Sequence, residues 1–265
     1  MLSNLATRII TAVVLVAVIL VTLFALPSPA ALVLVGGFFV VAAWEWSGFF
    51  SAGAITWRLV FVIFVMALAV IPLIYPEYQS VLPKLLWAAS FYWFLVWASF
   101  LFKVRISGAL LTAVAGLFAL LPAWYAFTIF AQGSSGYRPF LACILIVAAA
   151  DIGAYFAGKN FGRRKLAPQI SPGKTWEGFV GGMICGVATM VLTSGLYTDE
   201  FRLSFALLGF LFAASSVLGD LWVSSFKRTA GLKDSGVLLP GHGGVLDRVD
   251  GLIAVLPMFA LSFAS

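Results

Sequence analysis

SSFKRTAGLKDSGVLLPGHGGVLDRVD, from Ser224 to Asp250, is a polar, glycine-rich stretch in a chain that is otherwise mostly apolar. It contains lysines, arginines, aspartates and the only histidine of the protein, His242. Apolar runs long enough to lie in a bilayer flank it on both sides. A simple cytoplasmic loop would explain the basic residues but not three aspartates beside a Gly-His-Gly-Gly turn. The stretch therefore indicates a site that handles phosphate and a metal ion.

The composition places the chain in a membrane. Of its 265 residues, 63% are hydrophobic and 10% are charged, and the mean hydropathy is +1.09. A soluble domain carries about 25% charged residues. Cys143 and Cys185 lie inside apolar runs, as packing residues do. The net charge of +6 does not argue for nucleic acid, because the basic residues lie where a topology signal would put them.

Nine apolar segments approach the roughly 20 residues that a spanning helix needs. The first is longer than the apolar region of a signal peptide and is interpreted as a retained span. The predicted spans are Ile9–Leu26, Ala31–Phe50, Leu59–Ile74, Leu85–Phe102, Ser107–Phe130, Phe140–Ala157, Glu177–Tyr197, Leu203–Trp222 and Val249–Phe263. The predicted fold is thus an all-α integral membrane protein, polytopic with about nine transmembrane helices.

The distribution of basic residues predicts the orientation. With the loop 158–176 in the cytoplasm, thirteen of the sixteen Lys and Arg residues are inside, and only Lys84, Arg138 and Arg202 are outside. The N-terminus is then cytoplasmic. We predict an N-terminal part, residues 1–135, with spans one to five. The C-terminal part, residues 136–265, holds spans six to nine and two cytoplasmic catalytic loops, 158–176 and 223–246.

Carboxylates also gather at the predicted inner face. Acidic residues at or near the membrane are costly, and the positive-inside rule does not explain them. Several at span ends suggest one polar site that opens to the cytoplasm. They are Glu45, Asp151, Glu177, Asp220, Asp234, Asp247 and Asp250.

A second polar stretch, DIGAYFAGKNFGRRKLAPQISPGKTWEG, runs from Asp151 to Gly178. Ser171 followed by Pro172 predicts an N-cap and a first helical residue. A helix start beside Lys174 and Thr175 would form an anion site. The run 163–165, Arg-Arg-Lys, is interpreted as a topology and lipid-headgroup patch. Beyond it, glycines at 178, 182 and 186 predict close helix packing.

The types of side chain narrow the chemistry. Carboxylates alone would suit ion transport, and cations alone would suit lipid binding. Both together, with glycine N–H groups, suit nucleotide phosphates bridged by Mg²⁺. Beside glycines, His242 is expected to contact phosphate rather than act as a base, and the lipid side of the site could hold acyl chains. The residues thus indicate a membrane enzyme that moves phosphoryl or nucleotidyl groups onto or off a lipid phosphate.

The stretch SSFKR, four further residues, then KDSGVLLPGHGGVLDRVD resembles the signature of the phosphatidate cytidylyltransferases, or CDP-diacylglycerol synthases. DIGAYFAGKNFG and SPGKTWEG are also similar to that family. The resemblance implies a Mg²⁺-dependent nucleotidyltransferase that converts CTP, or dCTP, and phosphatidate into CDP-diacylglycerol and pyrophosphate. It also implies a multi-pass protein of the plasma (inner) membrane with its site facing the cytoplasm.

On this reading each group has an expected role. Asp220 and Asp247 are the main metal ligands, with Asp250 as a ligand or support. Catalytic roles fall to these three aspartates with Lys227, Arg228 and His242. Substrate contacts are expected from Ser171, Lys174, Thr175, Ser224, Lys233, Asp234, Gly243, Gly244 and Arg248.

Two other functions stay open. An ion-coupled transporter would carry its acids near the membrane midplane, and a lipid-phosphate kinase or related transferase would use another nucleotide. The sequence leaves undecided the acyl-chain preference, the number of metals, a homodimer, and the roles of Glu45, Asp151 and Glu177.

Overall fold

The computed structural model describes residues 4–51, 53–101, 107–133, 136–196 and 204–263. Within these ranges the nine long helices are α1 Asn4–Phe24, α2 Ser28–Ser47, α3 Ile55–Ile74, α4 Leu82–Leu101, α5 Ala109–Gln132, α6 Arg138–Phe161, α7 Trp176–Leu192, α8 Ser204–Thr229 and α9 Leu246–Phe263. Short 3₁₀ helices cover Pro76–Val81 and Ser194–Leu196, and strands β1 Lys165–Ala167 and β2 Ser171–Thr175 form a small hairpin. One helix occupies each predicted span.

The all-α membrane character is confirmed. Within the described ranges, six helical segments are long and apolar enough to cross a bilayer, and they correspond to α2, α3, α4, α5, α6 and α8. Apolar stretches in α1 and α7 are shorter. The count of nine spans and the cytoplasmic N-terminus stay predictions.

Two predicted loops begin later than expected. Helix α6 continues to Phe161, so residues 158–161 are helical, and α8 continues to Thr229, so residues 223–229 are helical. The extra turns of α8 are stable because they are packed: Phe226 is buried, with its ring 4.8 Å from that of Trp222. Lys227 and Arg228 lie in the last turn of α8, where cations offset the helix dipole.

The predicted helix start at Ser171 is wrong. Ser171 and Pro172 lie in β2, where Lys165 pairs with Thr175 and Ala167 with Ser171. A two-stranded sheet leaves each strand one unpaired edge, so a proline there need not cost a ladder bond. The helix begins at Trp176 instead, and the Thr175 hydroxyl caps it by accepting the Gly178 N–H at 3.1 Å.

Small residues bring α6, α7 and α8 together as predicted. A Cβ on Gly178 or Gly182 would lie 2.8 Å from a backbone carbonyl of α6. A Cβ on Gly186 would lie 2.5 Å from the Ala213 side chain of α8. These glycines therefore allow backbones to approach closely in a lipid environment.

An aromatic cluster joins the N-terminal helices to the C-terminal ones. Trp46 of α2 stacks on Trp222 of α8 with ring centroids 5.1 Å apart. Its indole N–H donates to the Thr112 carbonyl of α5 at 2.9 Å. Trp93 of α4 packs on the same Trp222 ring at 5.2 Å. Position 46 is thus fixed against α5 and α8, which also fixes its neighbour Glu45.

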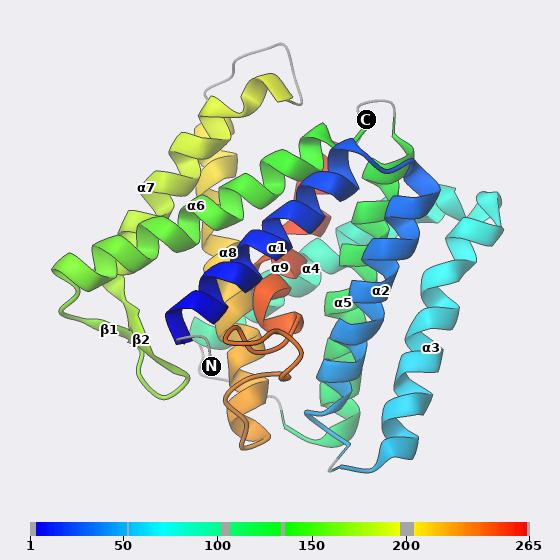
Figure 1. Ribbon diagram of the computed structural model, residues 1–265, viewed down its shortest axis with the longest axis horizontal. Coiled ribbons are helices and arrows are strands. Elements are labelled where there is room, and N and C mark those ends of the chain that lie inside the picture. The colour runs from blue at the N-terminus through cyan, green and yellow to red at the C-terminus, as the bar shows by residue number, and fades with distance from the viewer. Residues whose placement is uncertain (1–3, 52, 102–106, 134–135, 197–203, 264–265) are drawn as a thin grey trace.

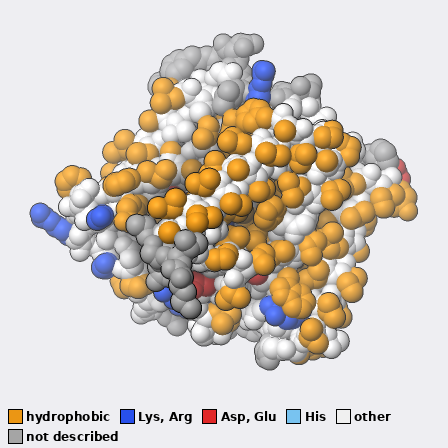
Figure 2. All heavy atoms as spheres, in the orientation of Figure 1, with side chains coloured by type: hydrophobic (Ala, Val, Ile, Leu, Met, Phe, Trp, Pro, Cys, Tyr) orange, Lys and Arg blue, Asp and Glu red, His pale blue; other side chains and the backbone are white. Residues whose placement is uncertain are grey.

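The polar segments gather at one end of the molecule. The hairpin and the α8–α9 connection lie at the lower edge, near the N mark, and the C mark lies at the opposite edge (Figure 1). Apolar side chains cover most of the face in Figure 2, and most of the blue lysines and arginines gather along its left and lower edges. This separation fits a protein that lies in a membrane with one polar end outside it.

Candidate active site

The two polar stretches, far apart in sequence, touch at the polar end. The Arg228 guanidinium donates through Nε to the Ile170 carbonyl of the hairpin at 3.1 Å, and through Nη1 to the Leu232 carbonyl at 3.0 Å. Helix α1 also reaches this end, where the Thr11 hydroxyl donates to the Pro240 carbonyl at 3.0 Å. Arg228 thus ties the hairpin to the end of α8.

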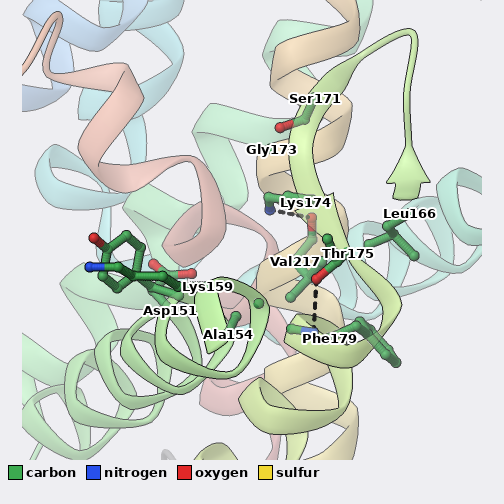
Figure 3. Close-up of a pocket in the computed structure, with 13 residues that line it drawn as sticks. Asp151, Ala154, Lys159, Leu166, Ser171, Gly173, Lys174, Thr175, Phe179 and Val217 are labelled. Atoms are coloured by element: carbon green, nitrogen blue, oxygen red, sulfur yellow. Dashed lines mark hydrogen bonds between the residues drawn. The ribbon is translucent and has the colours of Figure 1, made fainter. Parts of the chain in front are cut away.

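A cavity of about 410 Å³ lies between the hairpin, α6 and the start of α7. Figure 3 shows Asp151 and Lys159 on the α6 side, opposite Ser171, Lys174 and Thr175 of β2. The lining also includes Ala154, Tyr155, Gly158, Leu166, Gly173, Gly178, Phe179 and Val217. The three hairpin residues predicted to contact substrate therefore share one cavity.

The ammonium of Lys174, which lines this cavity, forms an ion pair with Asp220 of α8. Its Nζ lies 2.6 Å from Asp220 Oδ2 and 3.5 Å from the Val217 carbonyl of the same helix. The other oxygen, Asp220 Oδ1, accepts the Ser224 hydroxyl at 3.1 Å. The two charged side chains keep 23% and 32% of their surface exposed. A partly open lysine–aspartate pair can exchange partners when an anion or a cation enters.

A second ion pair, Lys227–Asp247, is more enclosed. Lys227 Nζ lies 2.7 Å from Asp247 Oδ1, and the two side chains are 7% and 6% exposed. Asp247 Oδ2 accepts the backbone N–H groups of Ser235 and Gly244, both at 2.9 Å. Burial alone would raise the pKa of Asp247, but Lys227 and the two N–H groups hold that pKa below its ordinary value. Asp247 is therefore an anion that fixes the loop onto α8.

Glu45 of α2 also anchors the loop between α8 and α9. Its carboxylate is buried and accepts the Ser235 hydroxyl at 2.8 Å, the Val245 N–H at 3.0 Å and the Leu246 N–H at 2.8 Å. It thus satisfies free N–H groups at the start of α9. A Cβ on Gly244 would lie 2.6 Å from the Glu45 carboxyl carbon, so glycine is required there.

The glycine turn positions His242. Gly241 and Gly243 have φ of +76° and +85°, which glycine adopts without strain. The Leu239 N–H donates to the Gly243 carbonyl and the His242 N–H to the Leu239 carbonyl, both at 2.9 Å. His242 Nδ1 is buried and has no hydrogen-bond partner within the described part of the chain.

The remaining predicted residues lie around this core. Asp250 Oδ1 accepts the Gly251 N–H at 2.8 Å. A Cβ on Gly219 would lie 2.5 Å from the Asp250 carbonyl. Helix α8 therefore packs closely against α9 next to Asp220. Lys233, Asp234 and Arg248 are exposed. Neither Arg228 nor His242 lines the cavity that Lys174 lines.

No compact metal cage is present in the described ranges, because no three His, Cys, Asp or Glu side chains lie close enough to hold an ion. The predicted ligands Asp220 and Asp247 are instead neutralised by lysines. Their role as metal ligands stays a prediction.

Several known proteins are similar to this chain. The model of a family described as the cytidylyltransferase family matches residues 6–265. The chain belongs to the cytidylyltransferase family. A phosphatidate cytidylyltransferase of Pseudomonas aeruginosa is 48% identical over 147 residues, which is 55% of this chain and 54% of that protein. One from Haemophilus influenzae is 50% identical over 121 residues, 44% of this chain and 42% of that protein.

A third relative, from Staphylococcus haemolyticus, is also named phosphatidate cytidylyltransferase and is 45% identical over 132 residues, 49% of this chain and 50% of that protein. The chain thus aligns with about half the length of the curated relatives it matches. The family resemblance seen in the sequence is confirmed.

The sequence did not assign the role of Glu45 or select Ser235. A charged residue inside the apolar run Ala31–Phe50 was the available signal for Glu45, because such residues need a partner. Its partners lie about 200 residues later in the chain, and no local pattern identifies them.

Proposed function

We propose that this cytidylyltransferase transfers CMP from CTP to phosphatidate, which gives CDP-diacylglycerol and pyrophosphate for phospholipid synthesis. The observation that carries the proposal is the pair of lysine–carboxylate contacts, Lys174–Asp220 and Lys227–Asp247, at the polar end of the molecule. Cations of this kind suit the phosphates of a nucleotide and of a lipid. The names of the similar proteins support the choice of substrates.

In the proposed reaction a phosphate oxygen of phosphatidate attacks the α-phosphorus of CTP. The bond from the α-phosphorus to the bridging oxygen breaks, and pyrophosphate leaves with the bond's electron pair. Such transfers depend on positioning and charge neutralisation more than on a protein nucleophile. Lys174, with Ser171 and Thr175 in the same cavity, would bind phosphate oxygens. Lys227, Arg228, Lys233 and His242 are the further predicted phosphate contacts.

We further propose that Mg²⁺ binds at Asp220, Asp247 and Asp250. Mg²⁺ commonly takes one or two protein carboxylates and completes its shell with phosphates and water, so a cage of three protein ligands is not required. A lysine ammonium already stands within 2.6 Å of Asp220, which supports a preference for positive charge at this point. When bound, Mg²⁺ would neutralise charge on the phosphates.

The orientation is part of the same proposal. Nine spans with a cytoplasmic N-terminus would place the hairpin and the α8–α9 connection in the cytoplasm of a cell whose plasma (inner) membrane holds the protein. In a protein with Cys143 and Cys185 replaced, we expect Lys165→Cys and Lys84→Cys to react with an impermeant thiol reagent from opposite sides. Reaction from the same side would reject this topology.

The direct test is an assay of the purified protein with phosphatidate and radiolabelled CTP, dCTP or ATP. We expect a labelled lipid product and one pyrophosphate per turnover with a cytidine nucleotide, and none with ATP. Transfer from ATP would instead favour a lipid kinase. Ion uptake by proteoliposomes without any transfer would favour a transporter, although the paired acids at one end of the helices count against it.

A further inference from the structure

A second cavity, of about 340 Å³, lies beneath α1. In Figure 1, α1 crosses the face of the molecule in front of α9. The cavity is lined by α1, α2, α5, α6 and α9, and its lining is almost entirely aliphatic or aromatic, with Val35, Trp124 and Ile144 among its members. Two charged residues are the exceptions, Asp151 and Arg248.

The two cavities meet at Asp151. This residue lines the polar cavity with Lys174 and Lys159, and it also lines the apolar one. Arg248 of α9 and Leu239 of the loop before α9 also line the apolar cavity. A molecule that spans the junction would therefore meet cations at one end and hydrocarbon at the other.

We propose that the cavity beneath α1 binds an acyl chain of the lipid phosphate substrate, with Arg248, a charged residue of its lining, holding the phosphate. The inference rests on the proposed function for the identity of the lipid. An arginine binds phosphate through a fork of N–H donors, and an aliphatic lining favours a hydrocarbon chain.

Bulk membrane lipid is the competing occupant, since α1 has a lipid-facing side. The charge of Arg248 distinguishes phosphatidate from bulk membrane lipid. A zwitterionic lipid offers no net negative charge to Arg248, so a phosphatidate should displace a bound probe far better than a phosphatidylcholine with the same chains.

The kinetic test compares two valines of α2. Val35 lines the cavity, whereas Val33 is 78% exposed on the outer side. We expect Val35→Phe to raise the KM for dioleoyl phosphatidate at least about tenfold, because a ring in the cavity displaces methylene groups. The KM for dihexanoyl phosphatidate and for CTP should change little. The matched control Val33→Phe should behave as wild type with both lipids.

A second variant keeps the test decisive if Val35→Phe does not fold. Ala148 of α6 also lines the cavity, one helical turn before Asp151, and Ala148→Phe should show the same dependence on chain length. The proposal is overturned if both filled variants treat long and short chains as the wild type does.

A binding experiment separates this inference from the proposed reaction. A phosphatidate with a diazirine near the end of one chain is irradiated with the wild-type protein, and the labelled peptides are identified. We expect labelling within the helices that line the cavity, α1, α2, α5, α6 or α9, that excess phosphatidate removes and excess phosphatidylcholine does not. Labelling that both lipids remove equally would overturn the cavity assignment. Specific labelling without cytidylyl transfer would retain the cavity and reject the proposed function.

Discussion

The C-terminal helices α6–α9 and the N-terminal helices α1–α5 are built for different tasks. Burial differs from helix to helix within both parts: 61% of the apolar segment is buried in α8 and 67% in α5, but 33% in α6 and 22% in α3. Trp57, Ile63 and Trp87 of α3 and α4 are each more than 60% exposed, as lipid-facing side chains are. The ion pairs lie in the C-terminal part, and the N-terminal helices mainly supply apolar walls.

Glu45 is a charged residue of the N-terminal part that binds the C-terminal part. It belongs to α2, yet its three hydrogen bonds go to the loop before α9 and to the start of α9. Asp247 accepts the backbone N–H groups of Ser235 and Gly244 in the same loop. The two carboxylates, Glu45 and Asp247, therefore fix the shape of the loop together. The comparison teaches that both parts of the chain hold the loop before α9, although the proposed substrate contacts belong to the C-terminal part.

The largest effect on stability is expected from breaking the Lys227–Asp247 pair. Lys227→Met leaves a buried carboxylate without its cation, which costs about 3–5 kcal/mol of unfolding free energy. Thermal unfolding in detergent should show this loss, and CTP turnover should disappear. Lys84→Met, at an exposed lysine, is the control and should match wild type.

The double variant Lys227→Met with Asp247→Leu sharpens the result. Replacing both charges by apolar groups should recover much of the stability, but turnover should stay absent if the charges also serve the reaction. A double variant with normal turnover would make the pair purely structural.

A smaller loss is expected from Glu45→Gln. The amide offers one acceptor oxygen to three donors, and each buried donor left unsatisfied costs about 1–3 kcal/mol. We expect a lower unfolding temperature and reduced turnover, although Glu45 lines neither cavity described above. Glu77→Gln, at an exposed acid, is the control. An unchanged unfolding temperature together with unchanged turnover in Glu45→Gln would show that the charge of this carboxylate is not needed to hold the loop.

The Lys174–Asp220 pair should matter little for stability and much for activity. Exposed pairs contribute about 0–1 kcal/mol, and this one is partly open. We expect Asp220→Asn and Lys174→Ala to unfold as wild type does but to lose turnover by more than about a hundredfold, or roughly 2.7 kcal/mol of barrier. Near-normal turnover of Asp220→Asn with an unchanged Mg²⁺ requirement would remove Asp220 from the metal site.

The sequence predicted the helices well because the bilayer requires long apolar runs, and one helix lies in each predicted span. It predicted helix ends less well. Ser224 and Lys227 look like loop residues by polarity, but their partners Asp220 and Asp247 and the buried Phe226 keep them helical. Tertiary contacts decided those turns, and no local pattern contains them.

The candidate site was predicted as a set of residues but not as an arrangement. Polarity and spacing selected Lys174, Asp220, Lys227 and Asp247. Which lysine meets which aspartate depends on how α8 faces β2 and α9. The prediction for Ser171 failed for a related reason. Ser171 and the proline after it match the pattern of a helix N-cap, but Ser171 pairs with Ala167 in the hairpin instead.

The smallest effect is expected at the basic run 163–165. The Glu177 carboxylate accepts the backbone N–H of Arg163 at 3.0 Å and of Arg164 at 3.3 Å, so these bonds do not need the arginine side chains. Both side chains belong to exposed residues and are interpreted as lipid-headgroup contacts. The double variant Arg163→Ala and Arg164→Ala should therefore change turnover in detergent by less than about twofold, since exposed charges contribute little. Glu177→Gln weakens the acceptor for both N–H groups and should have the larger effect, measured by the same assay. If the arginine variant loses activity while Glu177→Gln does not, the side chains rather than the turn serve the substrate, and the run 163–165 belongs to the active site.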